Sequence, residues 1–156
     1  MTGSAPMRSK MHELVRRWSS SGVKIREGAA ERAIRKFEER FHVQLPEDLR
    51  TFYSIVDGME ENDMDPVEQM RFWPLSEVIS VDEEFSGNEA VAGCPGFYIF
   101  ADYSLWAHGY AIDLRPGDPG TRGIILVGGD DPIAVASSFT DFISKYLYDS
   151  QSLFSG

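Results

Sequence analysis

Residues 37–58 read FEERFHVQLPEDLRTFYSIVDG, and this stretch decides the fold. The stretch begins inside a predicted amphipathic helix. That helix is indicated by apolar residues at spacings of four, three and four, namely Ala30, Ile34, Phe37 and Phe41. Pro46 suits the first turn of a second helix, where its missing N–H costs nothing. Gly58 is predicted to end that second helix as its C-terminal stop. Two consecutive helices with apolar faces therefore need a common core to cover.

The remainder of the chain predicts one more helix before this stretch and a β-rich second half. Apolar residues at helical spacing predict a helix over about 8–19, namely Met11, Leu14, Val15 and Trp18. Strands are predicted at 70–73, 96–101, 109–114, 123–128 and 133–136. Because short turns join the later strands, we expect antiparallel pairing.

The segments between and after these strands are predicted from turn and capping residues. Residues 75–81 are expected to form a short helix or an irregular turn, and 82–93 a mobile loop. Ser137 or Ser138 is predicted to cap a last helix, and 149–156 to be frayed. The fold class is therefore α+β, with N-terminal helices and a C-terminal helix packed on a mainly antiparallel sheet.

Composition narrows the class of protein further. The chain has 156 residues, which fits a single domain over 1–156. Its one cysteine, Cys94, permits no intrachain disulfide, and the first ten residues hold no apolar run of the kind a secretion signal needs. No segment approaches the length of a membrane span. We therefore expect a cytoplasmic protein.

Charge is divided unevenly along the chain. Residues 1–42 carry ten Lys and Arg against five Glu, whereas residues 43–156 carry five against twenty Asp and Glu. The net charge of −10 therefore combines a basic helical flank with an acidic body. An acidic body repels nucleic acid and anionic membranes and favours basic partners. The alternative is that the charge serves solubility alone.

The order of these features resembles the SUKH superfamily, which includes the fungal cell-wall regulator domain of the Smi/Knr type and many bacterial immunity proteins. The resemblance covers about residues 28–147 and excludes the basic helix over about 8–19. The matching pieces are, in order, Ile34, Phe37-Glu38, Leu45-Pro46, Phe52-Tyr53, Asp57-Gly58, Phe72 to Leu75, Gly109 to Asp113 and Ser138 to Phe142. Two departures stand beside it, since Asp57 replaces the usual Asn and the basic helix precedes the usual start.

The resemblance implies a non-enzymatic protein-binding module. The first function that the resemblance implies is that of an immunity protein, which neutralises a cognate toxin, often a nuclease. Such nucleases are basic on their nucleic-acid face, which the acidic body of this chain would complement. A regulator or scaffold of cell-wall synthesis is the second reading of the same resemblance. The oligomeric state stays open.

Motifs for catalysis or cofactor binding are weak in the sequence. His12, His42 and His108 share no metal-ligand spacing, and a lone cysteine makes no metal site, so we expect neither a metal nor a cofactor. A hydrolase could use two carboxylates drawn from Asp102, Asp113, Asp130 and Asp131. Asp113 is more simply explained as a residue that faces solvent or caps the turn after its strand.

The expected binding residues lie in the acidic loop after Gly58 and in turns of the β-rich half. The acidic loop contributes Glu60, Glu61, Asp63, Asp65 and Glu68. Trp106 is expected to be exposed in a turn between strands, and Asp130-Asp131 form a turn that adds charge. Trp73 is expected to pack in the core. A solvated loop without a partner is the alternative for the acidic segment.

Overall fold

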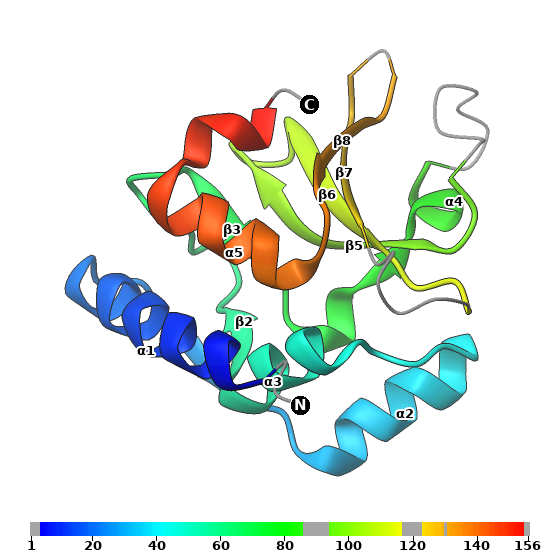
Figure 1. Cartoon of the computed structure of the whole chain (residues 1–156), viewed down its shortest axis with the longest axis horizontal. Helices are drawn as coiled ribbons and strands as arrows, with labels where there is room; N and C mark the ends of the chain where they lie inside the picture. Colours follow the sequence, from blue (N-terminus) through cyan, green and yellow to red (C-terminus); the bar gives the residue numbers. More distant parts are fainter. Residues whose placement is uncertain (1–3, 86–93, 117–122, 130, 155–156) are drawn as a thin grey trace.

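The computed structural model describes residues 4–85, 94–116, 123–129 and 131–154, and it is an α+β protein (Figure 1). The N-terminal half contains α1 (Ser4–Ser20), β1 (Ile25–Glu27), α2 (Glu31–Phe41), α3 (Glu47–Ile55) and β2 (Val56–Met59). The middle contains β3 (Met70–Phe72), the 3-10 helix η1 (Leu75–Glu77), β4 (Ile79–Ser80) and α4 (Val81–Glu84). The remainder contains β5 (Phe97–Tyr103), β6 (His108–Asp113), β7 (Ile124–Val127), β8 (Ile133–Ala136), α5 (Phe139–Tyr148) and the 3-10 helix η4 (Ser150–Phe154).

Two antiparallel sheets form from these strands. The larger has the order β3-β5-β6-β7-β8, with β4 also paired to β5, and the smaller pairs β1 with β2. The predicted antiparallel arrangement of the second half is therefore confirmed. The pair β1 and β2 was not predicted, because three- and four-residue strands carry too short a pattern to be recognised in sequence.

Both faces of the larger sheet are covered. One face packs against α1, α3 and α5 in a core that includes Trp18, Phe52, Phe72, Phe100 and Phe142. In Figure 1 α1 and α5 lie side by side in front of this face, and α2 lies at the lower end of the molecule. The opposite face holds a smaller apolar cluster around Trp73, Ile99, Ala111 and Val127. Trp73 thus packs in the interior, as its sequence context predicts.

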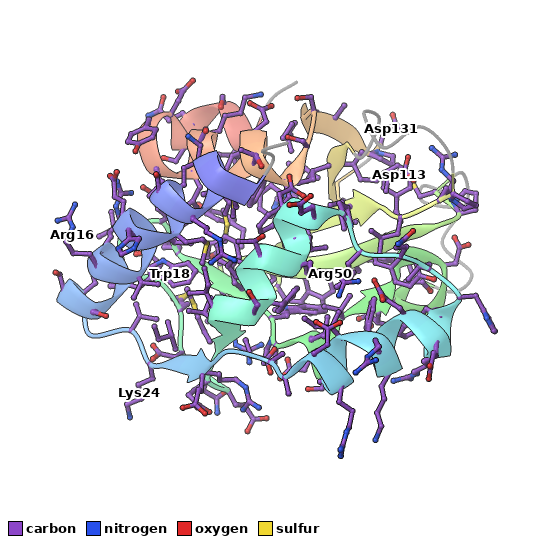
Figure 2. All side chains as sticks on the ribbon, turned by 60° about the horizontal axis from the view of Figure 1, so that its bottom comes forward. Arg16, Trp18, Lys24, Arg50, Asp113 and Asp131 are labelled. Carbon is purple, nitrogen blue, oxygen red and sulfur yellow. The ribbon has the colours of Figure 1, made fainter. Side chains whose placement is uncertain are left out.

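The stretch that decides the fold is held together by one carboxylate. Glu38 in α2 accepts hydrogen bonds from the main-chain N–H of Leu45 (2.8 Å) and from Arg50 Nη2 of α3 (2.6 Å). Arg50 also pairs with Glu31 at the start of α2 (3.1 Å), so that its side chain lies between the two helices (Figure 2). Glu38 therefore fixes the break between the helices that Leu45-Pro46 creates.

The predicted helix stop at Gly58 is wrong. The helix α3 ends at Ile55, Val56 is already extended, and Gly58 lies within β2 with φ of 70°. Its role is close packing, because a Cβ at this position would lie 2.5 Å from the main-chain nitrogen of Pro74. Asp57 assists by accepting a hydrogen bond from the main-chain N–H of Leu75 (2.7 Å).

Other segments also differ from prediction. Residues 150–154 form η4 rather than a frayed end, since Leu153 is fully buried and its carbonyl accepts a hydrogen bond from the Tyr110 hydroxyl (3.1 Å). The expected loop at 82–93 begins as the short helix α4, and its residues 86–93 lie outside the described part. Ser138 caps α5 as predicted, accepting a hydrogen bond from the N–H of Asp141 (3.0 Å).

We predict that Gly58→Ala lowers the free energy of unfolding by at least about 2 kcal/mol, because it adds a side chain at positive φ and against a neighbouring main chain. Urea unfolding followed by tryptophan fluorescence measures the loss. Gly129→Ala is the matched control, since nothing lies within 4 Å of the added Cβ, and its unfolding should change by no more than about 0.5 kcal/mol. Equal stability of the two variants would contradict the packing role of Gly58.

Candidate protein-interaction surface

Three connections meet at one end of the larger sheet. The loop 60–69 leads into β3, and its Gln69 carbonyl accepts a hydrogen bond from the N–H of Ser104 in the β5–β6 turn (2.7 Å). The β7–β8 turn lies against the β5–β6 turn, because a Cβ on Gly128 would lie 3.2 Å from the Ala107 carbonyl oxygen. In Figure 1 the β7–β8 connection and η4 lie together at the top of the view, at the opposite end from α2. We call residues 60–69, 104–107, 128–129 and 131–133 the loop end of the sheet.

Asp65 holds the loop 60–69 in place from the inside. Its carboxylate is buried, accepts hydrogen bonds from the N–H of Val67 (2.9 Å) and from the Tyr146 hydroxyl, and does not reach the surface. The Tyr146 oxygen in turn accepts a hydrogen bond from Trp18 Nε1 (2.9 Å). Burial, followed by the contact with Asp65, raises the pKa of Tyr146 well above its usual range, so this hydroxyl remains a donor. The expectation that Asp65 belongs to an exposed acidic patch is corrected by this burial.

Asp63 also serves the loop itself. Its two carboxylate oxygens accept hydrogen bonds from the main-chain N–H groups of Lys24 (2.6 Å) and Met64 (2.8 Å). The loop is thereby tied to the residues just before β1. Among the expected acidic residues, Glu60, Glu61 and Glu68 therefore carry the outward charge of the loop end.

These three glutamates differ in whether a neighbouring arginine neutralises their charge. Glu60 lies 3.7 Å from Arg26 in β1, so part of its charge is neutralised locally. In the described part of the chain, Glu61 and Glu68 have no ion pair. Their carboxylates are thus free to meet a cationic partner.

The β5–β6 turn has an unusual backbone. Ser104, Leu105 and Trp106 follow one another with φ of 51°, 55° and 75°, and none of them is glycine. Each such residue costs about 1–3 kcal/mol and persists only where surrounding contacts offset that cost, and such conformations concentrate at functional sites. Leu105 is 82% exposed at the tip of this turn.

Asp102 provides the contacts that hold the turn. Its Oδ2 accepts a hydrogen bond from Trp73 Nε1 (2.6 Å), and its Oδ1 accepts one from the main-chain N–H of Trp106 (3.3 Å). The Trp106 ring packs edge-on against Trp73 with 5.3 Å between centroids, and it covers Gly109. Trp106 is nevertheless 36% exposed, so it presents one side to solvent and is anchored by the other.

Each of the three connections at this end carries at least one exposed apolar side chain. Of the six large apolar side chains that are exposed in the described part, five are near it, namely Val67, Leu105, Trp106, Ile133 and Phe154. Phe154 joins them through its packing on Tyr103, the last residue of β5, with 4.7 Å between ring centroids. Sequence reasoning found only Trp106, although the isolated Val67 and Leu105 within polar turn sequences were a usable signal. Exposed apolar side chains accompanied by charged ones are typical of surfaces that bind other proteins.

The β7–β8 turn adds a hollow beside this apolar group. The hollow has a volume of about 380 Å³ and is lined by His108, Leu126, Gly129, Asp131 and Ile133. Asp131 is exposed, as a binding role requires, whereas Asp130 lies outside the described residues. The three expected groups, the acidic loop, Trp106 and Asp131, therefore lie at the same end of the sheet.

The two strand carboxylates considered for hydrolysis do not come together. Asp102 pairs with Gly109 of β6, and Asp113 lies four residues further along that strand, at least about 13 Å away by the strand rise. Asp113 accepts hydrogen bonds from the N–H of Arg115 (2.9 Å) and from its guanidinium, which is the turn-capping role expected from the sequence. Asp102 serves two tryptophans. A mechanism with both carboxylates on one substrate bond has no support in this geometry.

Metal ligands and membrane-spanning helices were also sought in the described part of the chain. Its His, Cys, Asp and Glu side chains form no group of three or more that could hold a metal ion. Of the helices described, none combines the length and the apolar character that crossing a membrane requires.

The loop end, which carries both exposed apolar and acidic side chains, has the composition of a protein-binding surface on an α+β scaffold. The profile of the SMI1 / KNR4 family (SUKH-1) matches residues 28–145, and the chain belongs to this family. The resemblance inferred from the order of motifs is thereby confirmed. A comparison with curated proteins finds no match. The helix α1 and the strand β1 precede the matched region, whereas loop 60–69 and both turns fall within it.

We predict that Tyr146→Phe lowers the free energy of unfolding by about 2–3 kcal/mol, because it leaves the buried Asp65 carboxylate and the Trp18 N–H without this partner. Chemical denaturation followed by circular dichroism measures the change. Tyr148→Phe on the same helix is the matched control: this side chain is exposed, its hydroxyl donates to Glu13 (2.6 Å), and its loss should change stability by no more than about 0.5 kcal/mol. A Tyr146→Phe protein as stable as the control would contradict the role of Asp65.

Proposed function

We propose that this protein is an immunity protein that binds a cognate toxin through the loop end of the sheet. The observation that carries the proposal is the occurrence of both exposed apolar and acidic side chains on the strained and anchored connections at one end of the sheet. Membership of the SMI1 / KNR4 family supports a role in protein–protein contact. The proposed setting is the cytoplasm, where a nuclease toxin would meet its substrate.

The apolar group supplies the proposed anchors. Leu105 and Val67, exposed to 82% and 72%, would lose most of their contact with water on binding. Trp106 is suited to the centre of an interface, since tryptophan is enriched among residues that contribute most to binding. Because Asp102 holds the Trp106 main chain and the Trp73 ring packs against the Trp106 ring, little side-chain freedom would be lost when a partner covers it.

The charge of the loop end indicates the chemistry of the partner. Glu61 and Glu68 lie on the same loop as Val67, Asp131 lies two residues before Ile133, and the chain as a whole carries a net charge of −10. Such a surface attracts a basic protein, and it repels nucleic acid and anionic lipid. A nuclease presents a basic face to its nucleic-acid substrate, so the proposed contact would cover that face and exclude the substrate.

A growth assay tests the proposal. Expression of the toxin domain encoded beside this gene should arrest growth, and co-expression of this chain should restore it. The purified pair should also form a complex on size-exclusion chromatography. If co-expression gave no rescue and the purified pair formed no complex, the immunity role would be overturned. The cell-wall regulatory role of the same family would instead give a growth or morphology defect on deletion of this gene alone.

We predict that the double reversal Glu61→Lys and Glu68→Lys slows association with the toxin by about tenfold at low salt and flattens the dependence of the rate on salt. Surface plasmon resonance over a salt series measures both effects. Glu27→Lys with Glu39→Lys makes the same change in net charge on exposed residues of β1 and α2, and should alter the rate far less. An equal effect of both pairs would show that net charge, and not the loop end, steers binding.

We predict that Leu105→Ala speeds dissociation of the complex by about tenfold, the consequence of losing about 1.4 kcal/mol at an interface anchor. The dissociation phase of the same measurement gives the rate. Since Leu105 is 82% exposed in the free protein, the Leu105→Ala variant should have the same thermal unfolding midpoint as the parent. An unchanged dissociation rate would remove the tip of this turn from the interface.

A further inference from the structure

The helix α1 lies before the family match and has two distinct faces. Its inward face places Met7, Met11, Leu14 and Trp18 in the main core. Its outward face carries Arg8, His12 and Arg16, which are exposed. Figure 2 shows Arg16 pointing away from the body of the protein while Trp18 points into it, with Arg16 at the far side of the view from Asp131. The basic face around Arg16 is therefore at a different part of the surface from the β7–β8 turn that carries Asp131 (Figure 2).

A groove runs along this face between α1 and α3. It has a volume of about 490 Å³ and is lined by Arg8, Met11, His12, Val15, Arg16 and Ile55. Met11, Val15 and Ile55 give it an apolar floor, and the basic residues stand at its edge. A volume of this size exceeds what one small apolar side chain would fill, so an occupant would insert several.

The basic residues of the groove form a regular row. Arg8, His12 and Arg16 are four residues apart, so they stand above one another along α1 at intervals of about 6 Å. In the described part of the chain, neither Arg8 nor Arg16 has an ion-pair partner. Arg17, by contrast, lies 3.6 Å from Glu13 and donates to the Leu147 carbonyl (2.9 Å). The positive charge of the row is thus available to a ligand.

We propose that the groove between α1 and α3 docks an acidic amphipathic helix from another protein. Such a helix with glutamates four residues apart presents carboxylates at the same interval of about 6 Å as the basic row. Its apolar side chains, three and four residues apart, would lie on Met11, Val15 and Ile55, which is the common helix-in-groove mode of recognition. The groove would then hold a second protein segment while the loop end holds the first.

Three other occupants fit the groove less well. A nucleic acid gains nothing from an apolar floor, and a membrane surface does not enter a hollow between two helices. The acidic loop of a second copy is not helical and would offer Val67 as its exposed large apolar side chain, so it would leave most of the apolar floor uncovered. The acidic helix alone uses both the floor and the row.

Fluorescence anisotropy with a synthetic peptide tests the proposal. The probe is a labelled, capped 15-residue peptide of Glu, Leu and Ala, with Leu three and four residues apart on one face and Glu four residues apart beside it. It should bind the full chain saturably, and the double variant Arg8→Glu with Arg16→Glu should bind at least about tenfold more weakly. The double variant Arg32→Glu with Arg35→Glu on α2 carries the same change in charge and should bind like the parent.

Further measurements separate the contribution of the apolar floor from that of the basic row. They also test whether another kind of ligand occupies the groove. Val15→Ala should weaken binding about threefold without unfolding the chain, and a peptide of the same composition without an apolar face should bind poorly. Equal binding by the two charge variants, or by the two peptides, would overturn the proposal. So would tighter binding of a single-stranded oligonucleotide or of phosphatidylserine vesicles, or a dimer in sedimentation that Arg8→Glu with Arg16→Glu dissolves.

Discussion

A buried chain of hydrogen bonds from Trp18 through Tyr146 to Asp65 joins parts of the protein that are far apart in sequence. It links α1, α5 and the loop that leads into β3. Because each group is both buried and partnered, loss of one would leave the others with unsatisfied polar atoms. The helix α1 lies outside the family match, yet its Trp18 ring contacts Phe72 and Tyr146 in the main core. This addition to the family domain is therefore part of the folded unit.

The loop end combines rigidity with exposure. Asp65 holds one loop from inside, and Asp102 holds the neighbouring turn through Trp73 and Trp106. Anchored turns of this kind keep apolar tips such as Leu105 in solvent, where an unsupported chain would rearrange to hide them. A surface that is already in place loses little conformational freedom when it is covered.

The helices and the sheet could be predicted from the sequence because their patterns are local. The stripe through Phe37 and the alternation around Ile112 follow the periods of a helix and a strand, and Pro46 starts its helix as expected. Gly58 was misassigned because its role depends on Pro74, which is distant in sequence, and not on the helix before it. The same limit applies to the site. Asp65 and Glu61 look alike in an acidic run, and only the position of Tyr146 shows that one is interior.

The three tryptophans lie in three different environments. Trp18 is fully buried in the main core, and Trp73 is nearly so in the smaller cluster, whereas Trp106 is partly exposed at the loop end. The Trp73 and Trp106 rings are close enough, at 5.3 Å and 72°, for their electronic transitions to couple. The protein thus contains its own optical probe: quenching by acrylamide reaches Trp106 first, and the near-ultraviolet dichroism of the pair registers any movement of the turn. Occupancy of the loop end can be followed by light without attaching a label.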